Sequence, residues 1–216
     1  MRDTTIGMGL TTDLITLAGT DAADIPATAR LRAEFSLFDW LACGIAGREE
    51  PVSRKVATLA RNEAGNGISS TFVGMSCSPR TAALVNGTVS HALDYDDTHF
   101  AHIGHLSVAI YPAALAVAES LDRSATEMVD AFVLGAEVAI RVGLALGSTH
   151  YNTGFHQTAT AGAFGATLAA SRLLGLTDEE LRHAIGLCAT RASGLKSQFG
   201  TMGKPLNAGF AAANGV

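Results

Sequence analysis

The 216-residue sequence has little of several features, and each shortage excludes a class of protein. Its three cysteines, Cys43, Cys77 and Cys188, lie far apart and form no Cys-x-x-Cys pair, so no zinc site, iron–sulfur site or disulfide framework is evident. The formal net charge of −5 argues against nucleic acid or an anionic membrane as the main partner. No apolar run is long enough to span a bilayer, so we expect no membrane segment.

Targeting signals are also missing from the amino-terminal part of the sequence. Residues 1–24 show no basic segment followed by a long apolar one, so they do not resemble a signal peptide. Widely spaced thiols are most simply interpreted as reduced. We therefore expect a cytoplasmic protein.

Small apolar residues dominate what is present, and they predict helices. Hydrophobic residues make up 48% of the chain and glycine occurs 23 times, whereas aromatic residues make up only 6%. Strand signals are nearly absent, with at most one short extended segment over 70–74, so the predicted fold class is all-α. The helices are expected at 12–18, 26–47 (largely buried), 51–64, from Ser78, 106–121, from the capping box Ser124-x-x-Glu127, 161–174, and from the capping box Thr177-x-x-Glu180.

The chemistry is concentrated in residues 86–107. This stretch holds three acids and four of the seven histidines of a chain that is only 16% charged. Clustered acids and bases are what proton-transfer enzymes require, although a polar loop with capping acids and solvent-facing histidines would look similar. Composition favours a functional site here without fixing its geometry.

Two further polar segments interrupt the helices. Residues 151–160 precede a small-residue helix whose first amides and hydroxyls could hold an anion such as a carboxylate. Residues 194–209 place Lys196 and Lys204 among glycines, again before a small-residue helix. Taken singly, His156 would more often be a structural loop residue and Lys204 a surface charge.

Together these segments resemble the MmgE/PrpD family in three ordered motifs. The first runs from Asn86-Gly through His91-Ala-Leu-Asp94 to His105-x-Ser and Pro112. The second is Gly154-Phe-His-x-Thr-Ala-Thr-Ala-Gly, and the third is Met202-x-Lys-x-Leu-x-Ala-Gly. The resemblance implies a large helical domain that is normally joined to a smaller α/β lid domain, usually in a homodimer.

The resemblance also implies a set of site residues in a pocket for a small polycarboxylate. His105, His156, Asp94 and Lys204 match catalytic positions of the family motifs, and Thr98 matches a polar position beside them. His102 competes with His105 because the segment from His99 is one residue longer than in the decarboxylases. The substrate-binding residues expected beside the catalytic four are Thr98, His102, Thr158 and Lys196.

Three other departures from the family pattern bear on these expectations. His-Leu-Ser replaces the usual His-Pro-Ser after position 105, and Asn207 replaces a histidine often found after the lysine. Family members are also about twice as long as this chain. We therefore expect residues 1–216 to be an incomplete helical domain without the lid, nearly inactive alone because nothing would close the pocket.

The residue types support proton chemistry next to a carboxylate. A histidine can act as a base near neutral pH, Lys204 can stabilise an enolate-like intermediate, and Asp94 is expected to orient a histidine. No redox motif or phosphate-binding glycine loop is present, so the reaction should need no cofactor. The predicted function is a lyase that dehydrates or decarboxylates a di- or tricarboxylate, with an epimerase of an amino- or imino-dicarboxylate as the alternative.

Two alternative functions, each from a different functional class, also fit the sequence. A metal hydrolase could use the spacings His91-x-x-Asp94 and His99-x-x-His102-x-x-His105, although Gly104 weakens the helix that the latter needs. A non-catalytic helical interaction module could use its small-residue helices only for assembly. We also expect a homodimer or a higher assembly, because helices 106–121 and 161–174 should expose apolar surface and the family resemblance implies a dimer as well.

Overall fold

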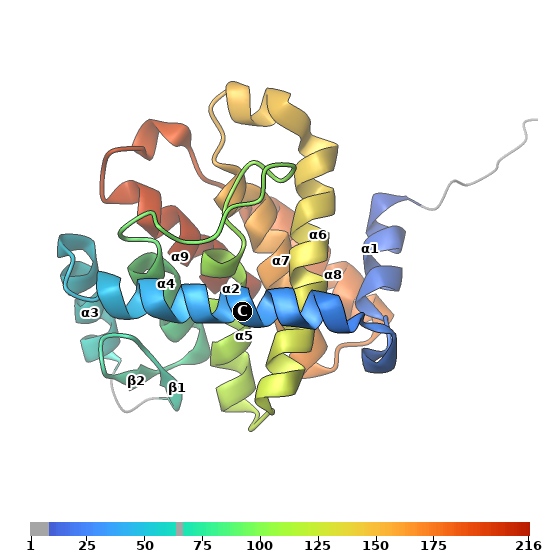
Figure 1. The fold of residues 1–216 in the computed structure, drawn as a ribbon, viewed down its shortest axis with the longest axis horizontal. Coiled ribbons are helices and arrows are strands. Elements are labelled where there is room, and N and C mark those ends of the chain that lie inside the picture. The colour runs from blue at the N-terminus through green and yellow to red at the C-terminus, as the bar shows by residue number, and fades with distance from the viewer. Residues whose placement is uncertain (1–8, 64–66) are drawn as a thin grey trace, which may run out of the picture.

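The computed structural model describes residues 9–63 and 67–216, and it confirms the all-α prediction. In chain order the helices are α1 (Leu10–Ala18), α2 (Ala27–Gly47), α3 (Pro51–Asn62), α4 (Pro79–Ser90), α5 (Ser107–Ser120), α6 (Ala125–Asn152), α7 (Gln157–Leu174), α8 (Asp178–Arg191) and α9 (Gly203–Gly215) (Figure 1). Short 3-10 turns lie at Ala22–Asp24 and Lys196–Gln198. None of the helices in the described ranges combines the length and apolarity needed to cross a bilayer.

The helix boundaries follow the local signals in the sequence. Both predicted capping boxes form: Ser124 with Glu127 begins α6, and Thr177 with Glu180 begins α8. The single extended segment expected near residue 70 is wrong in detail, because two strands form there, β1 (Ser69–Ser70) and β2 (Ser76–Cys77), paired antiparallel.

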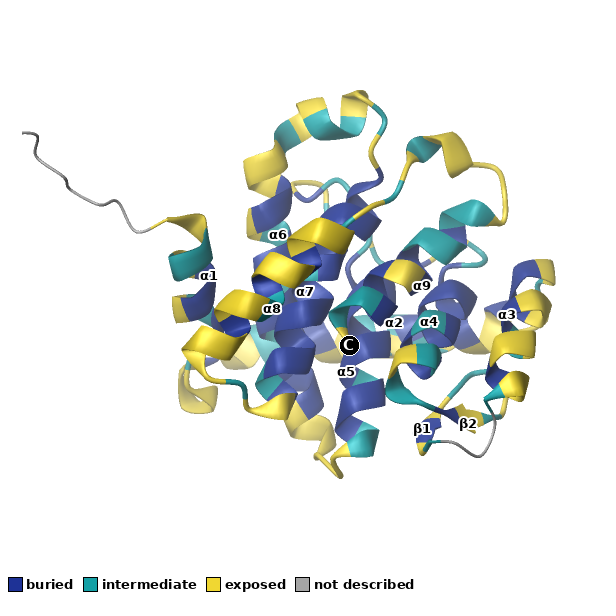
Figure 2. Cartoon of the chain, turned by 180° about the vertical axis from the view of Figure 1, so that it is seen from behind, coloured by how far each residue is buried: buried dark blue, intermediate teal, exposed yellow. Residues whose placement is uncertain are grey.

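The core lies along α5 and α7, which pack against each other and are surrounded by α4, α6 and α9. Figure 2 shows both helices in dark blue over most of their length. The expectation that these two helices would expose apolar surface is therefore wrong. Their small side chains allow close packing inside the bundle rather than contacts outside it.

Helix α2 was expected to be largely buried, and it is not. It lies across the outside of the bundle in Figure 1 and is buried only at Ala33, Trp40, Cys43, Gly44 and Gly47. Its inner face is anchored by the Trp40 ring, which lies 5.6 Å from the Tyr111 ring centre in the core. Its apolar pattern was mixed because the opposite, exposed face is apolar too.

Glycines set the distance between α6 and α7. A Cβ atom added to Gly135 would lie 2.6 Å from the carbonyl oxygen of Gly165, and a Cβ added to Gly165 would lie 2.6 Å from that of Gly135. No real side chain tolerates such a contact. The two helices can approach this closely only while both positions lack a side chain.

We expect Gly135→Ala to lower the free energy of unfolding by about 1–3 kcal/mol, because the helices must move apart in a packed core. Gly186→Ala is the matched control, since it is also helical but a Cβ there meets no atom within 4 Å. It should leave stability unchanged or raise it by up to about 1 kcal/mol. Urea denaturation followed by circular dichroism measures both, and equal effects would contradict the packing argument.

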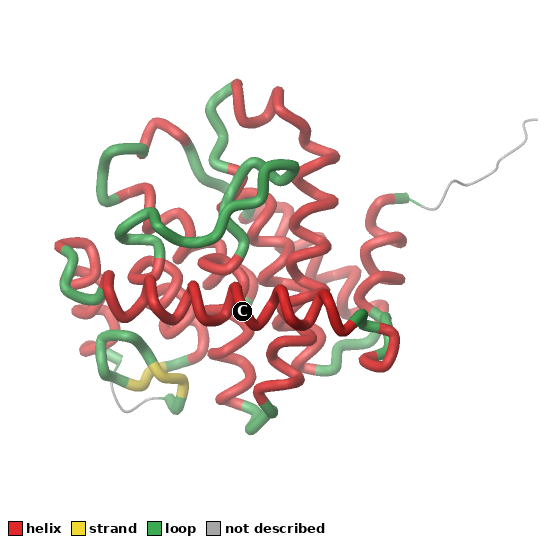
Figure 3. The backbone as a smooth tube through the Cα atoms, viewed as in Figure 1, coloured by secondary structure: helices red, strands yellow, loops and turns green. Residues whose placement is uncertain are grey.

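The polar segments gather at one end of the bundle. Figure 3 shows the loop after α4, the loop before α7 and the loop before α9 in the same region, above α2. Residues more than 100 positions apart, such as Asp94 and Lys204, form an ion pair there. Loops at one end of a rigid bundle are a common setting for functional groups.

Candidate active site

The loop between α4 and α5 carries most of the acids and bases, and its backbone is held in an unusual shape. Asp94 and Ile103 have positive φ angles of 60° and 55°, which non-glycine residues adopt rarely and mostly where the surroundings enforce them. The His99 amide donates to the Gly104 carbonyl at 2.9 Å, which closes the loop tip. The Thr158 hydroxyl then accepts from the His105 amide at 3.0 Å and ties the loop to α7.

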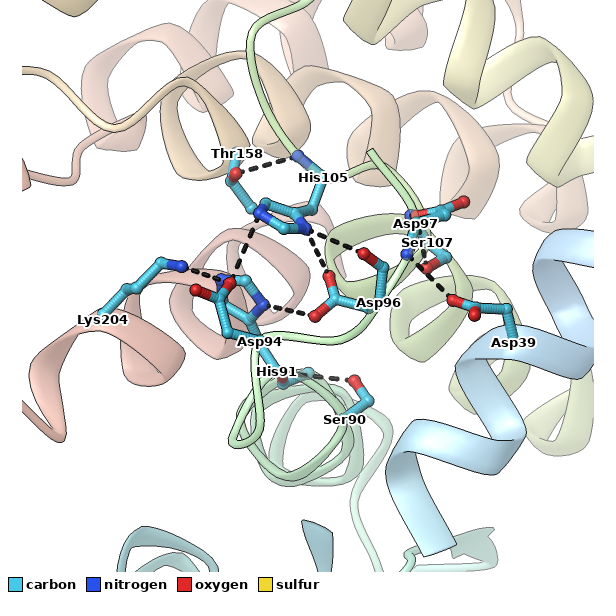
Figure 4. Close-up of polar contacts among 11 residues, drawn as sticks. Asp39, Ser90, His91, Asp94, Asp96, Asp97, His105, Ser107, Thr158 and Lys204 are labelled. Atoms are coloured by element: carbon cyan, nitrogen blue, oxygen red, sulfur yellow. Dashed lines mark hydrogen bonds and ion pairs between the residues drawn. The ribbon is translucent and has the colours of Figure 1, made fainter. Parts of the chain in front are cut away.

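Asp96 is the buried acid at the centre of this loop. One carboxylate oxygen, Oδ1, lies 2.9 Å from His91 Nδ1, and the other, Oδ2, lies 2.8 Å from His105 Nδ1 (Figure 4). Burial alone would raise the pKa of Asp96, but the charges and hydrogen bonds of the two histidines outweigh it and hold that pKa well below its ordinary value. Asp96 is therefore a charged carboxylate that bridges two imidazoles.

His105 is oriented by this bridge. Its Nδ1 also lies 3.2 Å from the backbone carbonyl of Asp96, so all of its near neighbours are acceptors and Nδ1 must carry the proton. Its Nε2 points the other way, 3.5 Å from Asp94 Oδ1. Burial would lower the pKa of His105, yet the hydrogen bond and charge of Asp96 raise it above the usual value. His105 is thus prepared to act as an acid at Nε2.

His156 lies opposite, at the N-cap of α7, and its environment has the reverse effect. Its amide donates to the Gly194 carbonyl at 3.0 Å, and Gly194, at φ 145°, leaves no room for a side chain beside Ala159. Burial, together with the neighbouring charges of His91, Lys204 and His105, lowers the pKa of His156 to about 3. His156 is therefore neutral and can serve as a base or hydrogen-bond partner.

Lys204 supplies a cation from the first turn of α9. Its amine pairs with the Asp94 carboxylate and lies 5.2 Å from the Phe199 ring centre. Only 15% of its side chain is exposed, whereas 52% of the Asp94 side chain is exposed. A lysine held this way offers a fixed positive charge to an anionic ligand.

These groups surround a cavity of about 400 Å³. The four expected catalytic residues, Asp94, His105, His156 and Lys204, all line it, and so do Thr98 and Thr158. The complete lining is Asp94, Thr98, His99, Phe100, Ile103, Gly104, His105, Tyr151, His156, Thr158, Phe199 and Lys204. Its volume suits a small molecule, and the lining combines an acid, a base and a cation.

The chain matches a known protein-family model over most of its length. A protein-family model, the MmgE/PrpD N-terminal domain, matches residues 16–216. The chain belongs to the MmgE/PrpD family. The prediction from the three sequence motifs is therefore confirmed at the level of the family.

Several similar proteins are named after the same activity. The chain is 33% identical over 204 residues to the cis-aconitate decarboxylase-like protein oryM of Aspergillus oryzae, covering 90% of this chain and 42% of that protein. It is 32% identical to the cis-aconitate decarboxylases of Aspergillus terreus and Homo sapiens, covering 99% and 86% of this chain and 46% and 40% of those proteins. The chain thus spans less than half the length of these relatives.

Two of the residues expected to bind substrate lie outside the cavity of this MmgE/PrpD domain. His102 is fully buried, and its Nδ1 donates to the Ala139 carbonyl of α6 at 3.1 Å. The amine of Lys196 donates to the backbone carbonyl of Tyr151 at 3.2 Å and lies 3.6 Å from the centre of the Tyr151 aromatic ring. His102 anchors the loop, and Lys196 holds the end of α6.

The direction of the His102 ring distinguishes it from His105 and bears on the hypothesis of a metal site. Because His102 turns toward α6, the set His99, His102 and His105 does not converge on one point. A different group does: donor atoms of His91, Asp94, Asp96 and His105 lie within 4.8 Å of one another. Both histidines of that group, however, direct Nδ1 at Asp96.

The sequence patterns did not select Asp96 and His91 as site residues. Asp94 was expected to orient a histidine, but Asp96 contacts Nδ1 of His105, whereas Asp94 faces Nε2 and Lys204. The signal in the sequence was the alternation Asp94-Tyr-Asp96, since one acid of such a pair faces inward and the other outward. Choosing between them required the positive φ of Asp94.

A second cavity, of about 700 Å³, lies between α1, α6, α7 and α8. Its lining is mainly apolar, with His150, Thr160 and Arg182 as the principal polar members, and it contains no carboxylate. Burial lowers the pKa of His150. Without a paired acid and base, this larger cavity is a poorer candidate for proton chemistry than the one around His105.

The buried histidines make stability depend on pH. Burial lowers the pKa of His102 to about 4, whereas the unfolded chain binds that proton near pH 6.5. Keeping His102 neutral therefore contributes fully to the free energy of unfolding above pH 6.5. This contribution is lost as the pH falls toward 4, by up to about 1.4 kcal/mol per pH unit. Urea denaturation at a series of pH values measures how the free energy of unfolding changes with pH. His102→Gln should reduce this dependence by the contribution of about one proton between pH 4 and 6.5. His183→Gln, at an exposed position, is the matched control for the substitution itself.

Proposed function

We propose that this domain contributes the acid–base centre of a cofactor-independent lyase that acts on a small polycarboxylate, with decarboxylation of cis-aconitate as the favoured reaction. The observation that carries the proposal is the pair of histidines on one cavity with pKa values moved in opposite directions. Such a pair provides an acid and a base at the same pH. The names of the similar proteins support the choice of reaction.

The cavity has the groups that a tricarboxylate would need. Lys204 can bind one carboxylate, and the hydroxyls of Thr98 and Thr158, with the first amides of α7, can bind another. Asp94 would then have to share Lys204 with the substrate. Before substrate binds, the ion pair with Asp94 holds the Lys204 amine in position and neutralises its charge.

In the proposed decarboxylation, His105 acts as the acid through Nε2. Its Nε2–H donates a proton to an alkene carbon of the substrate, and the carbon–carbon bond to one carboxylate breaks. The electron pair of the broken bond forms the shifted double bond, and the carboxylate leaves as carbon dioxide. Asp96 stabilises the protonated imidazole before transfer, and neutral His156 can hydrogen-bond the substrate or hold a proton in return.

The same histidine pair supports a second candidate, dehydration or epimerisation. Neutral His156 could remove a proton next to a carboxylate, and His105 could protonate a departing hydroxyl or the opposite face of the carbanion. The observation that favours this candidate is that the two rings line one cavity from different elements, the loop before α5 and the start of α7. Decarboxylation is preferred because the similar proteins are named for it.

The test is to supply cis-aconitate and 2-methylcitrate separately, in deuterium oxide and with and without a strong chelator, to a protein that carries this domain together with the pocket-closing lid that the family resemblance implies. Release of carbon dioxide from cis-aconitate, unchanged by chelation, is the expected result. Loss of water from 2-methylcitrate, or deuterium in recovered substrate of inverted configuration, would replace decarboxylation by the second candidate. Activity that chelation abolishes and a divalent ion restores would overturn the cofactor-free proposal.

A further inference from the structure

Tyr151 lines the candidate active site from the last turn of α6. Its hydroxyl has no hydrogen-bond partner among the residues that the structure describes. A phenol hydroxyl can donate one hydrogen bond, and the oxygens of an ionised carboxylate only accept. Tyr151 therefore offers the cavity an unused donor for an anionic ligand.

Lys196 holds the Tyr151 ring in place. The Lys196 amine lies 3.6 Å from the centre of the ring and donates to the Tyr151 carbonyl at 3.2 Å. The same carbonyl accepts from the Gly154 amide at 3.2 Å, and the Lys196 amide donates to the Gly154 carbonyl at 2.8 Å. The 3-10 turn at Lys196 is thus tied to the end of α6 through both backbone and side chain.

The end of α6 depends on this anchor because the helix is interrupted just before it. Gly147 has φ 67° and ψ 179°, outside the helical region, so residues 148–152 form a separate turn. A single helical turn is unstable by itself, since few backbone hydrogen bonds offset its loss of conformational freedom. The contacts of Lys196 therefore determine where Tyr151 lies relative to the cavity.

The lysine also changes the chemistry of the phenol. A positive charge over the face of an aromatic ring is attracted to its electron density and polarises the ring toward itself. Withdrawing electron density from a phenol makes its O–H group a stronger hydrogen-bond donor. Such a donor suits a carboxylate, because hydrogen bonds to an ionised acceptor are about twice as strong as neutral ones.

A tricarboxylate has one carboxylate more than the donors assigned so far would bind. Under the proposed function, Lys204 binds one carboxylate, the threonine hydroxyls with the first amides of α7 bind another, and His105 and His156 exchange protons. Two donors remain in the cavity lining, His99 and Tyr151. His99 also borders a separate cavity of about 370 Å³ between α2 and α6. Tyr151 is therefore the better candidate for the third carboxylate.

We propose that the Tyr151 hydroxyl binds the third carboxylate of a tricarboxylate substrate, and that Lys196 is the positioning residue that holds and polarises it. This inference rests on the proposed polycarboxylate function and narrows its substrate class to tricarboxylates in preference to dicarboxylates. It also assigns a role to a lysine whose amine lies outside the cavity lining.

Binding of two matched, unreactive acids tests the role of Tyr151. Propane-1,2,3-tricarboxylate and glutarate differ only by the central carboxylate, and neither has the alkene that the proposed decarboxylation needs. Isothermal titration calorimetry is carried out on a protein that carries this domain together with the lid that the family resemblance implies. Tyr151→Phe should weaken binding of the tricarboxylate by about tenfold or more and binding of glutarate by less than about twofold.

Tyr95→Phe is the matched control for this substitution. Tyr95 is 77% exposed and lies outside the cavity lining, so its loss of a hydroxyl should leave both affinities unchanged. Retained binding of glutarate by Tyr151→Phe shows in the same experiment that the variant is folded.

A double-mutant cycle tests the role of Lys196. Lys196→Met should weaken binding of the tricarboxylate by about two- to fivefold, and Lys196→Arg should retain most of the affinity, because a guanidinium can also lie over the ring. In the Tyr151→Phe background, Lys196→Met should add less than about twofold, since the hydroxyl through which it acts is already missing. Equal losses in the two backgrounds would overturn the positioning role.

Two results would overturn the role of Tyr151 and leave the proposed function in place. The first is an equal loss of affinity for both acids in Tyr151→Phe, and the second is a larger loss for the tricarboxylate in His99→Gln than in Tyr151→Phe. A wild-type protein that binds neither acid would instead overturn the polycarboxylate function, and this inference with it.

Discussion

Replacing Asp96 with asparagine is expected to lower kcat/KM for cis-aconitate by about 10³- to 10⁴-fold. An amide can present a donor to His105 Nδ1, which would displace the proton from Nδ1 to Nε2 or break the contact. Loss of the carboxylate that fixes a catalytic histidine costs about 10⁴ in serine proteases, where the geometry is analogous. The charge that raises the pKa of His105 is lost at the same time.

The pH profile separates this effect from simple misfolding. If His105 must be protonated to act, kcat/KM falls as the pH rises through its pKa, and Asp96→Asn should move that fall to lower pH. Asp97→Asn is the control, because Asp97 Oδ1 accepts from the Ser107 amide and hydroxyl at 3.0 and 2.8 Å and caps α5. It should cost stability but leave the pH profile in place. Equal losses in the two variants, with no shift, would contradict the role given to Asp96.

The second large effect is expected at Lys204. Lys204→Met should lower kcat/KM by about 10²- to 10³-fold, because the cavity would lose its fixed cation and leave Asp94 to repel an anionic substrate. Lys196→Met is the control, since its amine contacts Tyr151 and lies outside the cavity lining. We expect less than a tenfold change there. Steady-state kinetics measures kcat/KM for both variants. A larger loss for Lys196→Met than for Lys204→Met would indicate that Lys196, and not Lys204, binds the substrate.

The sequence predicted the elements of this fold well where local chemistry determines them. The capping boxes at Ser124 and Thr177 and the proline at the start of α4 identified helix starts that the structure confirms. Burial was harder to predict. Helix α2 is apolar on two opposite faces, and periodicity alone cannot say which of them meets the core. The small-residue helices were misjudged for the converse reason, because alanine and glycine suit a tight core as well as an interface.

For the site, the motifs selected segments that the structure brings together at one cavity, but they did not determine every contact within it. Asp94, His105, His156 and Lys204 lie at one cavity because their loops end at the same side of the bundle. His102 and His105 differ only by three positions in a loop, and the tight turn at Ile103 sends their rings in opposite directions. Backbone conformation of this kind is set by tertiary contacts, so residue type and spacing do not reveal it.

The arrangement also shows how an apolar protein can keep a charged group inside. Asp96 is 3% exposed, and each of its carboxylate oxygens lies within 2.9 Å of an imidazole nitrogen. A lone buried carboxylate would be costly and would take up a proton instead. Two histidines prevent this, and in return one of them gains the orientation and the raised pKa of an acid.

The most direct test of this account is a pH titration of the imidazole nitrogens by ¹⁵N NMR, with His105 assigned by comparison with His105→Gln. The account predicts that His105 titrates above pH 6.5 with the proton on Nδ1 in its neutral form, and that Asp96→Asn lowers this pKa. A His105 that titrates at or below 6.5 in the wild type, or that carries its neutral proton on Nε2, would contradict the assignment of His105 as the acid held by Asp96.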